Sequence, residues 1–306
     1  MRLQQSHSFG KLFLAFVLAS RPKTLSAVII PVLLGGVLAL KTGGTRWWNI
    51  PLCLWAGLWI QIATNFANDY YDWLQGADTA KRVGPQRMTQ AGLVTPRMMR
   101  YAFIGAFALA GVAAIWLSWT VTYWYLPLFV VSVVLGIGYT ARPLALAYRG
   151  LGDFPAFFFF GPVAVVATFL AVNPNWDWGA LYLGIGQGGF ALALLNVNNL
   201  RDVQTDREAG KLTLPVRFGS WLGFSLFLFG LLCGWGAPLL LLMREKTVIS
   251  GLLVTVGIGT IPAVTAVRHA VRGKEERSLF NRALALVAAT QLIEGLGLLL
   301  WLVLCC

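Results

Sequence analysis

Long runs of apolar residues recur along the whole chain, and they restrict the folds open to it. Of the 306 residues, 58% are hydrophobic and only 12% are charged, whereas a soluble domain carries about 25% charged residues. Several of the runs reach the ~20 residues that a helix needs to cross a bilayer. The sequence therefore predicts an all-α, polytopic membrane protein.

Charged residues, prolines and glycines divide these runs into nine expected membrane-spanning helices. They are expected over residues 24–41, 50–68, 99–118, 122–140, 151–172, 178–198, 219–243, 247–267 and 283–304. Apolar side chains at helical spacing in residues 11–20 predict an interfacial helix before the first span. From the polar N-terminus we expect no cleavable signal peptide, and we expect a single transmembrane domain over residues 1–306.

Basic residues concentrate in alternate loops. The formal net charge is +12, which in a soluble protein would suggest a nucleic-acid partner. Here the loops after the second, fourth, sixth and eighth spans hold many Lys and Arg, whereas those after the third and fifth hold none. Because basic loops stay in the cytoplasm, we expect the N-terminus and the loops after the even-numbered spans on the cytoplasmic side. The C-terminus is then expected on the opposite side. The charge thus needs no nucleic acid to explain it.

The cysteines and histidines do not suggest a metal centre. Cys53, Cys233, Cys305 and Cys306 lack the spacing of metal ligands, and the chain has only two histidines. We interpret the cysteines as small apolar membrane residues, and the sequence assigns no further role to Cys305 or Cys306.

Half of the twelve acidic residues lie in two short clusters, each at the end of an apolar run. The first cluster spans residues 65–72, with Asp78 close behind, and the second spans residues 198–206, followed by Glu208. An ionised carboxylate beside a bilayer is costly, and a divalent cation removes both the repulsion and the solvation deficit. Because the available ligands are all oxygens, magnesium is favoured over zinc or copper.

The spacing within each cluster places its carboxylates on one helical face. Asp69 and Asp72 are three residues apart, and Asp202 and Asp206 are four apart. Magnesium usually binds through one or two carboxylates together with substrate phosphates. We therefore predict a magnesium site formed by these four residues and Asn68. The alternative, salt bridges to the loop arginines, does not explain why the acids recur with Asn at helical spacing.

Basic and aromatic residues surround the two clusters. Positive groups around a metal pair are what a diphosphate needs, although each could instead serve only to set topology. The flanking basic residues are Arg21, Lys23, Arg87, Arg142 and Lys211. Tyr70, Tyr71, Tyr139, Tyr148 and the run 157–160 are candidates to line a cavity and stabilise a developing cation, although a Phe stripe in a membrane helix more often contacts lipid.

The motifs resemble those of the UbiA superfamily of intramembrane aromatic prenyltransferases, and within it the 1,4-dihydroxy-2-naphthoate prenyltransferases. The likeness runs from about Arg21 to the last span and is carried by residues 21–24, 65–72, 84–87, 148–153 and, most specifically, 198–219 (NNLRDVQTDREAGKLTLPVRFG). The superfamily's first motif, NDxxDxxxD, is matched at Asn68, Asp69 and Asp72, but Gly76 occupies its last position and Asp78 lies two residues later. The second motif, DxxxD, is matched at Asp202 and Asp206.

The resemblance implies nine helices around a central cavity and a magnesium-dependent transfer to an aromatic ring. The expected donor is a polyprenyl, geranylgeranyl or phytyl diphosphate and the expected acceptor is 1,4-dihydroxy-2-naphthoate, with loss of diphosphate and carbon dioxide on the way to menaquinone or phylloquinone. The expected catalytic residues are Asp69, Asp72, Asp202, Asp206, Tyr139 and Lys211, and the expected substrate-binding residues are Arg21, Lys23, Asn65, Asn68, Arg87, Arg142, Arg149, Asp153, Asn199 and Arg201.

Two alternatives stay open. One is a superfamily member that acts on another acceptor, such as 4-hydroxybenzoate, homogentisate, protohaem or chlorophyllide. The other is a secondary transporter that uses the clusters as ion sites, although such sites tend to lie on broken helices at the bilayer midplane. The length of the prenyl tail and the oligomeric state are not readable from the sequence.

Overall fold

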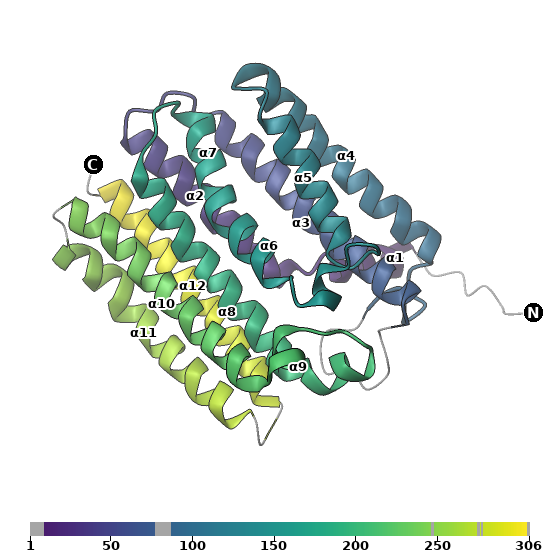
Figure 1. Ribbon diagram of the computed structural model, residues 1–306. Helices are drawn as coiled ribbons and strands as arrows, with labels where there is room; N and C mark the ends of the chain where they lie inside the picture. Colours follow the sequence, from purple (N-terminus) through teal and green to yellow (C-terminus); the bar gives the residue numbers. More distant parts are fainter. Residues whose placement is uncertain (1–8, 77–86, 246–247, 274–275, 277, 305–306) are drawn as a thin grey trace, which may run out of the picture.

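The computed structural model of the chain describes residues 9–76, 87–245, 248–273, 276 and 278–304 (Figure 1). The side chains of residues 23 and 248–258 lie outside this description. The α-helices are α1 (Phe9–Ala19), α2 (Ser26–Lys41), α3 (Asn49–Leu74), α4 (Pro96–Thr120), α5 (Tyr125–Gly138), α6 (Asp153–Phe158), α7 (Ala164–Val172), α8 (Trp178–Glu208), α9 (Leu214–Phe218), α10 (Ser220–Arg244), α11 (Val248–Arg272) and α12 (Ser278–Leu304). The described residues contain no β-strand, in agreement with the all-α prediction.

Each predicted span coincides with a helical element. Among the described residues, six elements have the length and hydropathy of a membrane span, namely α3, α4, the run from α6 to α7, α8, α10 and α12. α2 and α5 are shorter apolar helices, and α11 covers residues 248–267 of the predicted span 247–267. The chain is an integral membrane protein, whereas the number of nine crossings remains a prediction.

Two helices continue well beyond their predicted ends. α3 ends at Leu74 rather than near residue 68, and α8 ends at Glu208 rather than near residue 198. The apolar pattern detects only the part of a helix that suits lipid, whereas the backbone hydrogen bonds continue into polar turns. Both acidic clusters therefore lie on the last turns of continuous helices.

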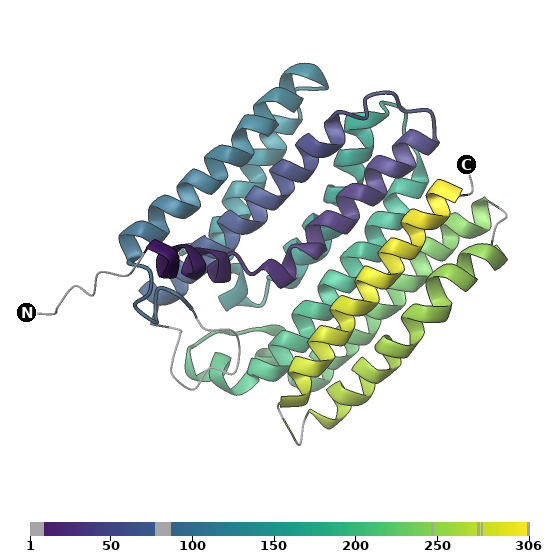
Figure 2. The same ribbon diagram turned by 180° about the vertical axis from the view of Figure 1, so that it is seen from behind.

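The long helices alternate in direction along the bundle. As a result, the acidic ends of α3 and α8 lie at the same end of the molecule, together with α1 and α9 (Figure 1; Figure 2). The C-terminal end of α12 lies at the opposite end (Figure 1). α1 exposes an apolar face formed by Phe9, Phe13, Leu14 and Leu18, as expected of a helix at a membrane interface.

A π-helical turn, Phe159–Val163, joins α6 to α7 and packs tightly against α8. A Cβ atom on Gly161 would lie 2.3 Å from the carbonyl oxygen of Gly184 and 2.5 Å from the Cα of Gly188. Only glycine therefore allows the two backbones to approach this closely. The contact fixes α6, which begins at Asp153, alongside α8.

A buried polar network joins α8 to α12 inside the bundle. Gln187 Nε2 donates to Glu294 Oε2 over 3.1 Å, and Gln291 Nε2 donates to Gln187 Oε1 over 3.1 Å. The three side chains are at most 1% exposed. Interhelical hydrogen bonds of this kind fix the register of α8 against α12.

An apolar cavity of about 140 Å³ lies between α2, α3, α4, α5 and the α6–α7 run. Its walls include Gly57, Tyr125, Phe129, Phe159 and Phe160. Two members of the phenylalanine run thus line a cavity, whereas Phe158 is exposed.

Candidate active site

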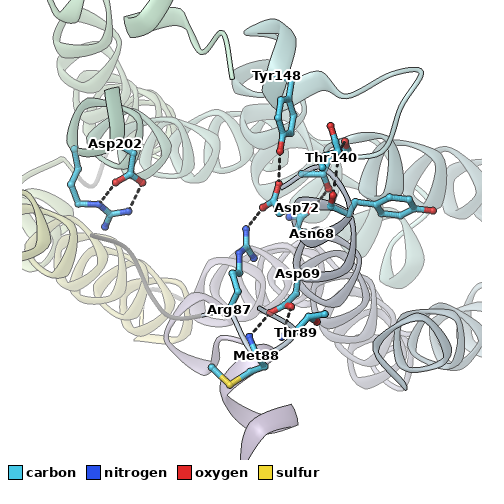
Figure 3. A network of polar contacts seen from close by, with 12 residues as sticks. Asn68, Asp69, Asp72, Arg87, Met88, Thr89, Thr140, Tyr148 and Asp202 are labelled. Atoms are coloured by element: carbon cyan, nitrogen blue, oxygen red, sulfur yellow. Dashed lines mark hydrogen bonds and ion pairs between the residues drawn. The ribbon is translucent and has the colours of Figure 1, made fainter. Parts of the chain in front are cut away.

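The first acidic cluster lies on the last turns of α3 around a buried ion pair. Asp72 accepts hydrogen bonds from the Arg87 guanidinium and, over 3.0 Å, from the Tyr148 hydroxyl (Figure 3). Asp72 is 1% exposed and Arg87 is 5% exposed. Asn68, one turn earlier, accepts a hydrogen bond from Thr140 Oγ1 over 2.7 Å. One face of α3 thus presents two predicted metal ligands, Asn68 and Asp72, and the guanidinium of Arg87 from the following segment bonds Asp72.

Asp69 has a different set of partners, although only three residues separate it from Asp72. Its Oδ2 accepts a hydrogen bond from the Met88 N–H over 2.9 Å, and its Oδ1 accepts one from the Thr89 N–H over 3.0 Å. Both oxygens therefore hold the backbone of the segment that carries Arg87 (Figure 3). The role of Asp69 as a metal ligand remains a prediction.

The second acidic cluster lies on the last turns of α8 and repeats the pairing of aspartate with arginine. Arg201 Nε and Nη2 donate to the two oxygens of Asp202, each over 2.7 Å. Arg201 Nη1 donates to Asn281 Oδ1 of α12 over 2.9 Å. Arg201 is 4% exposed, so the pair lies largely out of solvent. Asn199 and Asp206 lie one turn before and one turn after this pair.

Both clusters occupy the C-terminal ends of their helices, where the helix macrodipole is negative. Carboxylates at this end are unfavourable unless a cation neutralises them, and the two arginines do so here. No three Asp, Glu, His or Cys side chains among the described residues lie close enough to hold a metal by themselves. Oxygen donors shared between two helices nevertheless suit Mg²⁺, which is usually held by one or two carboxylates and substrate phosphates rather than by a protein cage.

Tyr139 directly follows α5, and both clusters act on it electrostatically. Its hydroxyl lies within electrostatic range of Asp72 from the first cluster and Asp206 from the second. Asp153 and Arg21 also act on it. Predicted site residues from five separate segments of the chain thus interact electrostatically.

The connection after α8 docks on the connection after α5. The Leu212 N–H donates to the Tyr148 carbonyl oxygen over 3.0 Å, and Arg217 Nη1 donates to the Arg149 carbonyl oxygen over 3.0 Å. Lys211 Nζ lies 5.5 Å from the centroid of the Tyr148 ring. Because the Tyr148 hydroxyl also bonds the first cluster, this docking links the segment after the second cluster to the first.

Two further predicted residues are held by hydrogen bonds between segments. Asp153 Oδ1 accepts a hydrogen bond from Asn196 Nδ2 of α8 over 2.6 Å. Asn65 Nδ2 donates to the Ser20 carbonyl oxygen over 2.9 Å, which ties the end of α1 to α3. These two residues thus help to assemble the site end of the bundle.

Other predicted residues lie at the edge of the site or beyond the description. Arg142 and Arg149 are exposed. Arg21 has a left-handed backbone with φ of 54°, a conformation that is uncommon for a non-glycine residue, and it turns the chain between α1 and α2. Lys23 follows in a short 3-10 turn, and its side chain is not described, while Asp78 lies outside the described residues.

Several contributors were not among the predicted site residues. Sequence patterns indicate Tyr148 only as a cavity-lining aromatic, and Asn196 precedes Asn199 at helical spacing, a signal that could have found it. Thr140 and Asn281 carry no such signal. Asn281 is 80 residues from Arg201 along the chain, so only helix packing reveals their contact.

Comparison with known protein sequences gives a consistent result. The profile of the UbiA prenyltransferase family matches residues 28–304. The chain is 31% identical over 285 residues to a 1,4-dihydroxy-2-naphthoate octaprenyltransferase of Mycobacterium tuberculosis, covering 93% of this chain and 88% of that protein. It is 34% identical over 221 residues to the enzyme of the same name from Escherichia coli, covering 67% and 68%. It is 28% identical over 218 residues to a 2-carboxy-1,4-naphthoquinone phytyltransferase of Synechocystis, covering 70% and 68%.

Solved structures share the fold. The chain superposes with a TM-score of 0.65 on a digeranylgeranylglyceryl phosphate synthase, covering 95% of this chain and 99% of that one at 14% identity. The TM-score is 0.58 for a UbiA homolog from Archaeoglobus fulgidus bound to DMAPP and Mg²⁺, covering 91% and 98% at 15% identity. At these identities the likeness concerns the fold alone.

Proposed function

The chain belongs to the UbiA prenyltransferase family, and from this premise we propose that it transfers a prenyl chain from a prenyl diphosphate to 1,4-dihydroxy-2-naphthoate. The transfer releases diphosphate and, because the new bond replaces the ring carboxylate, carbon dioxide. The product is a demethylated precursor of menaquinone or phylloquinone. Relatives named as 1,4-dihydroxy-2-naphthoate octaprenyltransferases, at 31% and 34% identity, support this acceptor.

The observation that carries the proposal is the presence of two aspartate–arginine pairs at one end of a membrane bundle. Asp72 pairs with Arg87 at the end of α3, and Asp202 pairs with Arg201 at the end of α8. Carboxylates suit Mg²⁺, and guanidinium groups suit phosphate oxygens. Together they provide what a diphosphate beside a bilayer requires.

The acidic clusters are proposed to hold the metal. Mg²⁺ held by Asn68, Asp72, Asp202 and Asp206, with Asp69 as the remaining candidate, would act as a Lewis acid on the departing diphosphate. The A. fulgidus homolog bound to Mg²⁺ supports this requirement. Arg87, Lys211 and Lys23 are proposed to bind the diphosphate and neutralise the charge that it gains on leaving.

The remaining residues are proposed to shape the reaction space. The Tyr148 hydroxyl bonds Asp72 of the first cluster, and Tyr139 lies within electrostatic range of both clusters. An aromatic face at such a site can stabilise an allylic cation. The surrounding apolar helices exclude the water that would capture this cation. The connection from α5 to α6, with Arg142, Arg149 and Asp153, is proposed to position the acceptor. The carboxylate of dihydroxynaphthoate needs a cation that is not committed to the diphosphate, and this connection supplies two arginines.

The test is an assay of the purified protein in detergent. We expect Mg²⁺-dependent formation of a prenylated naphthoquinol, identified by its mass, with diphosphate and carbon dioxide released in equal amounts. A chelator should abolish it. Turnover of 4-hydroxybenzoate or homogentisate in place of dihydroxynaphthoate would favour the alternative acceptors. Absence of diphosphate release with any acceptor would contradict a prenyltransferase and reopen the transporter alternative.

The site end of the bundle is proposed to face the cytoplasm, because the basic loops lie at this end. A reporter fused in the loop between α8 and α10 should read cytoplasmic, and one fused after Cys306 should read external. A cytoplasmic C-terminus would mean that one predicted span does not cross.

A further inference from the structure

Arg201 is fixed in a position that blocks Asp202. Its Nε and Nη2 occupy both carboxylate oxygens, each at 2.7 Å, while Nη1 is held by Asn281 Oδ1 at 2.9 Å. The guanidinium is 4% exposed and cannot lose its proton in a protein. The charge of a carboxylate so paired is neutralised, and each of its oxygens has already used one of its two acceptor sites.

The first cluster contains a related pair, in which Arg87 bonds one oxygen of Asp72 and the Tyr148 hydroxyl bonds the other. Arg87 bonds Asp72, and both groups are buried. The backbone beside Arg87 is held by the two oxygens of Asp69, through the N–H groups of Met88 and Thr89. In each cluster, therefore, one aspartate is paired with an arginine, and a further residue outside the pair fixes the arginine's position.

A guanidinium and a divalent cation cannot share one of these carboxylates without strong repulsion, since like charges a few ångströms apart in a poorly solvated site interact strongly. We propose that Arg201 and Arg87 are exchangeable counter-ions, which neutralise Asp202 and Asp72 before substrate binds and turn to the diphosphate when the carboxylates take the divalent cation. This inference rests on the proposed function. It assigns Asn281 as a positioning residue that holds Arg201 in the first of these two states.

The exchange has a definite thermodynamic consequence. Cation binding must displace the arginine, so the arginine weakens cation binding while no diphosphate is present. Once displaced, the arginine is available to a diphosphate, so cation and diphosphate must strengthen each other's binding by the same factor. Loss of Arg201 should therefore affect the two ligands in opposite directions, which a residue that merely supports the fold would not do.

The test uses the full chain in detergent, with Mn²⁺ as the probe and its free concentration followed by electron paramagnetic resonance. Without diphosphate, Arg201→Gln should bind Mn²⁺ roughly five- to a hundredfold more tightly than the unaltered protein. Asn281→Ala, which only loosens the arginine, should bind it about two- to tenfold more tightly. With Mn²⁺ saturating, Arg201→Gln should bind inorganic diphosphate about ten- to a hundredfold more weakly.

Arg207→Gln is the matched control. Arg207 lies on the same helix, carries the same charge and is exposed. Its loss should leave both affinities nearly unchanged, and thermal unfolding should establish that every variant is folded. If Arg207→Gln changed both affinities as much as Arg201→Gln does, the loss of a positive charge anywhere near the site would explain the result, and the exchange would be wrong.

The outcomes separate this inference from the proposed function. If the unaltered protein binds Mn²⁺ but Arg201→Gln binds it equally or more weakly, the exchange is wrong and the metal site stands. If the unaltered protein binds no Mn²⁺ with or without diphosphate, both the metal site and the exchange are wrong.

Discussion

The two acidic clusters contain the same kind of ion pair, but the chain builds it differently in each. At the end of α8, Arg201 and Asp202 are neighbours in sequence, and Asn281 of α12 anchors the arginine. At the end of α3, Asp72 meets an arginine fifteen residues later in the chain, and Asp69 holds the backbone beside that arginine. One pair thus depends on the packing of two helices, and the other depends on a connecting segment that folds back.

This difference predicts unequal sensitivity. Connecting segments open at lower free energy than packed helices, so the first cluster should respond more strongly than the second when its supporting residue is changed. The paired aspartates themselves should be equally important, because each supplies the same chemistry. Changes to the aspartates and to their supporting residues test these two expectations and should have the largest effects, whereas changes farther from the pairs should have smaller ones.

The largest effect should come from the paired aspartates. Asp72→Asn and Asp202→Asn should each lower kcat/KM for prenyl transfer by roughly a hundred- to a thousandfold, because an amide carries no charge to offset a divalent cation. Steady-state assays at saturating Mg²⁺ measure this, with thermal unfolding as the check on folding. Near-normal turnover of either variant would mean that only one cluster holds the metal.

Asp69→Asn should separate positioning from ligation. An amide can accept only one of the two backbone hydrogen bonds and presents its NH₂ group to the other N–H. Loss of one such charge-assisted bond corresponds to about 1.5–3 kcal/mol, so donor affinity should fall about ten- to a hundredfold as Arg87 loses its support.

The discriminating measurements are hydrogen exchange and Mn²⁺ affinity. Positioning by Asp69 predicts faster amide exchange at Met88 and Thr89 with Mn²⁺ affinity reduced far less than in Asp72→Asn. If the two variants lose Mn²⁺ equally, Asp69 is a ligand, as the motif spacing predicts, and the two clusters are more alike than their contacts indicate. Asn281→Ala, the corresponding change in the second cluster, should reduce turnover less.

Arg142→Ala tests the segment between the clusters. Loss of one charge-assisted contact with the acceptor carboxylate should raise the KM for dihydroxynaphthoate about tenfold or more, with little change in the KM for the prenyl donor. Kinetics with each substrate varied in turn measure this. A change confined to the donor would move Arg142 to the diphosphate site and leave the acceptor carboxylate without an assigned partner.

Tyr148→Phe should have a smaller effect and should act on the first cluster alone. It removes the 3.0 Å hydrogen bond to Asp72 but keeps the ring that faces Lys211. A hydrogen bond to a charged group contributes about 1.5–3 kcal/mol, and the pairing with Arg87 already offsets part of the charge on Asp72, so turnover should fall about tenfold. Tyr148→Ala, which removes both contacts, should fall further, and identical losses for the two variants would exclude a role for the ring.

Asp177→Ala is the remote comparison. It changes the N-terminal end of α8, whereas the second cluster lies at the C-terminal end of that helix. Asp177 caps α8 through a 2.6 Å hydrogen bond from the Gly179 N–H and pairs with Arg244. Loss of such a cap lowers the free energy of unfolding by about 0.5–2 kcal/mol. The melting temperature should therefore fall slightly while kcat/KM stays unchanged, and a loss of activity would show that the site senses the whole helix.

The pH dependence of this contribution has a definite sign. Burial alone would raise the pKa of Asp177, but hydrogen bonds from Arg244 and the Gly179 N–H outweigh it and hold the pKa below its ordinary value. The stabilisation is therefore present above the ordinary pKa of aspartate and is lost as the pH falls through the lowered value. The difference in melting temperature between the unaltered protein and Asp177→Ala should shrink in acid.

The sequence by itself determined the all-α membrane class, the approximate position of each helix, the two acidic clusters and the family. These properties are local, because the match of an apolar run to lipid and the spacing of residues on one helix face depend on near neighbours alone. The polar ends of α3 and α8 were underestimated for the same reason, since an apolar criterion stops where the lipid-facing surface ends.

Only the tertiary structure decided how the polar groups pair. Nothing in the spacing of Asp69 and Asp72 indicates that one bonds two backbone amides while the other bonds Arg87 and Tyr148. The contact of Arg201 with Asn281 joins residues 80 positions apart. Such bonds depend on which helices pack together and in what register, which the glycine contacts of α8 and its buried bonds to α12 establish in three dimensions.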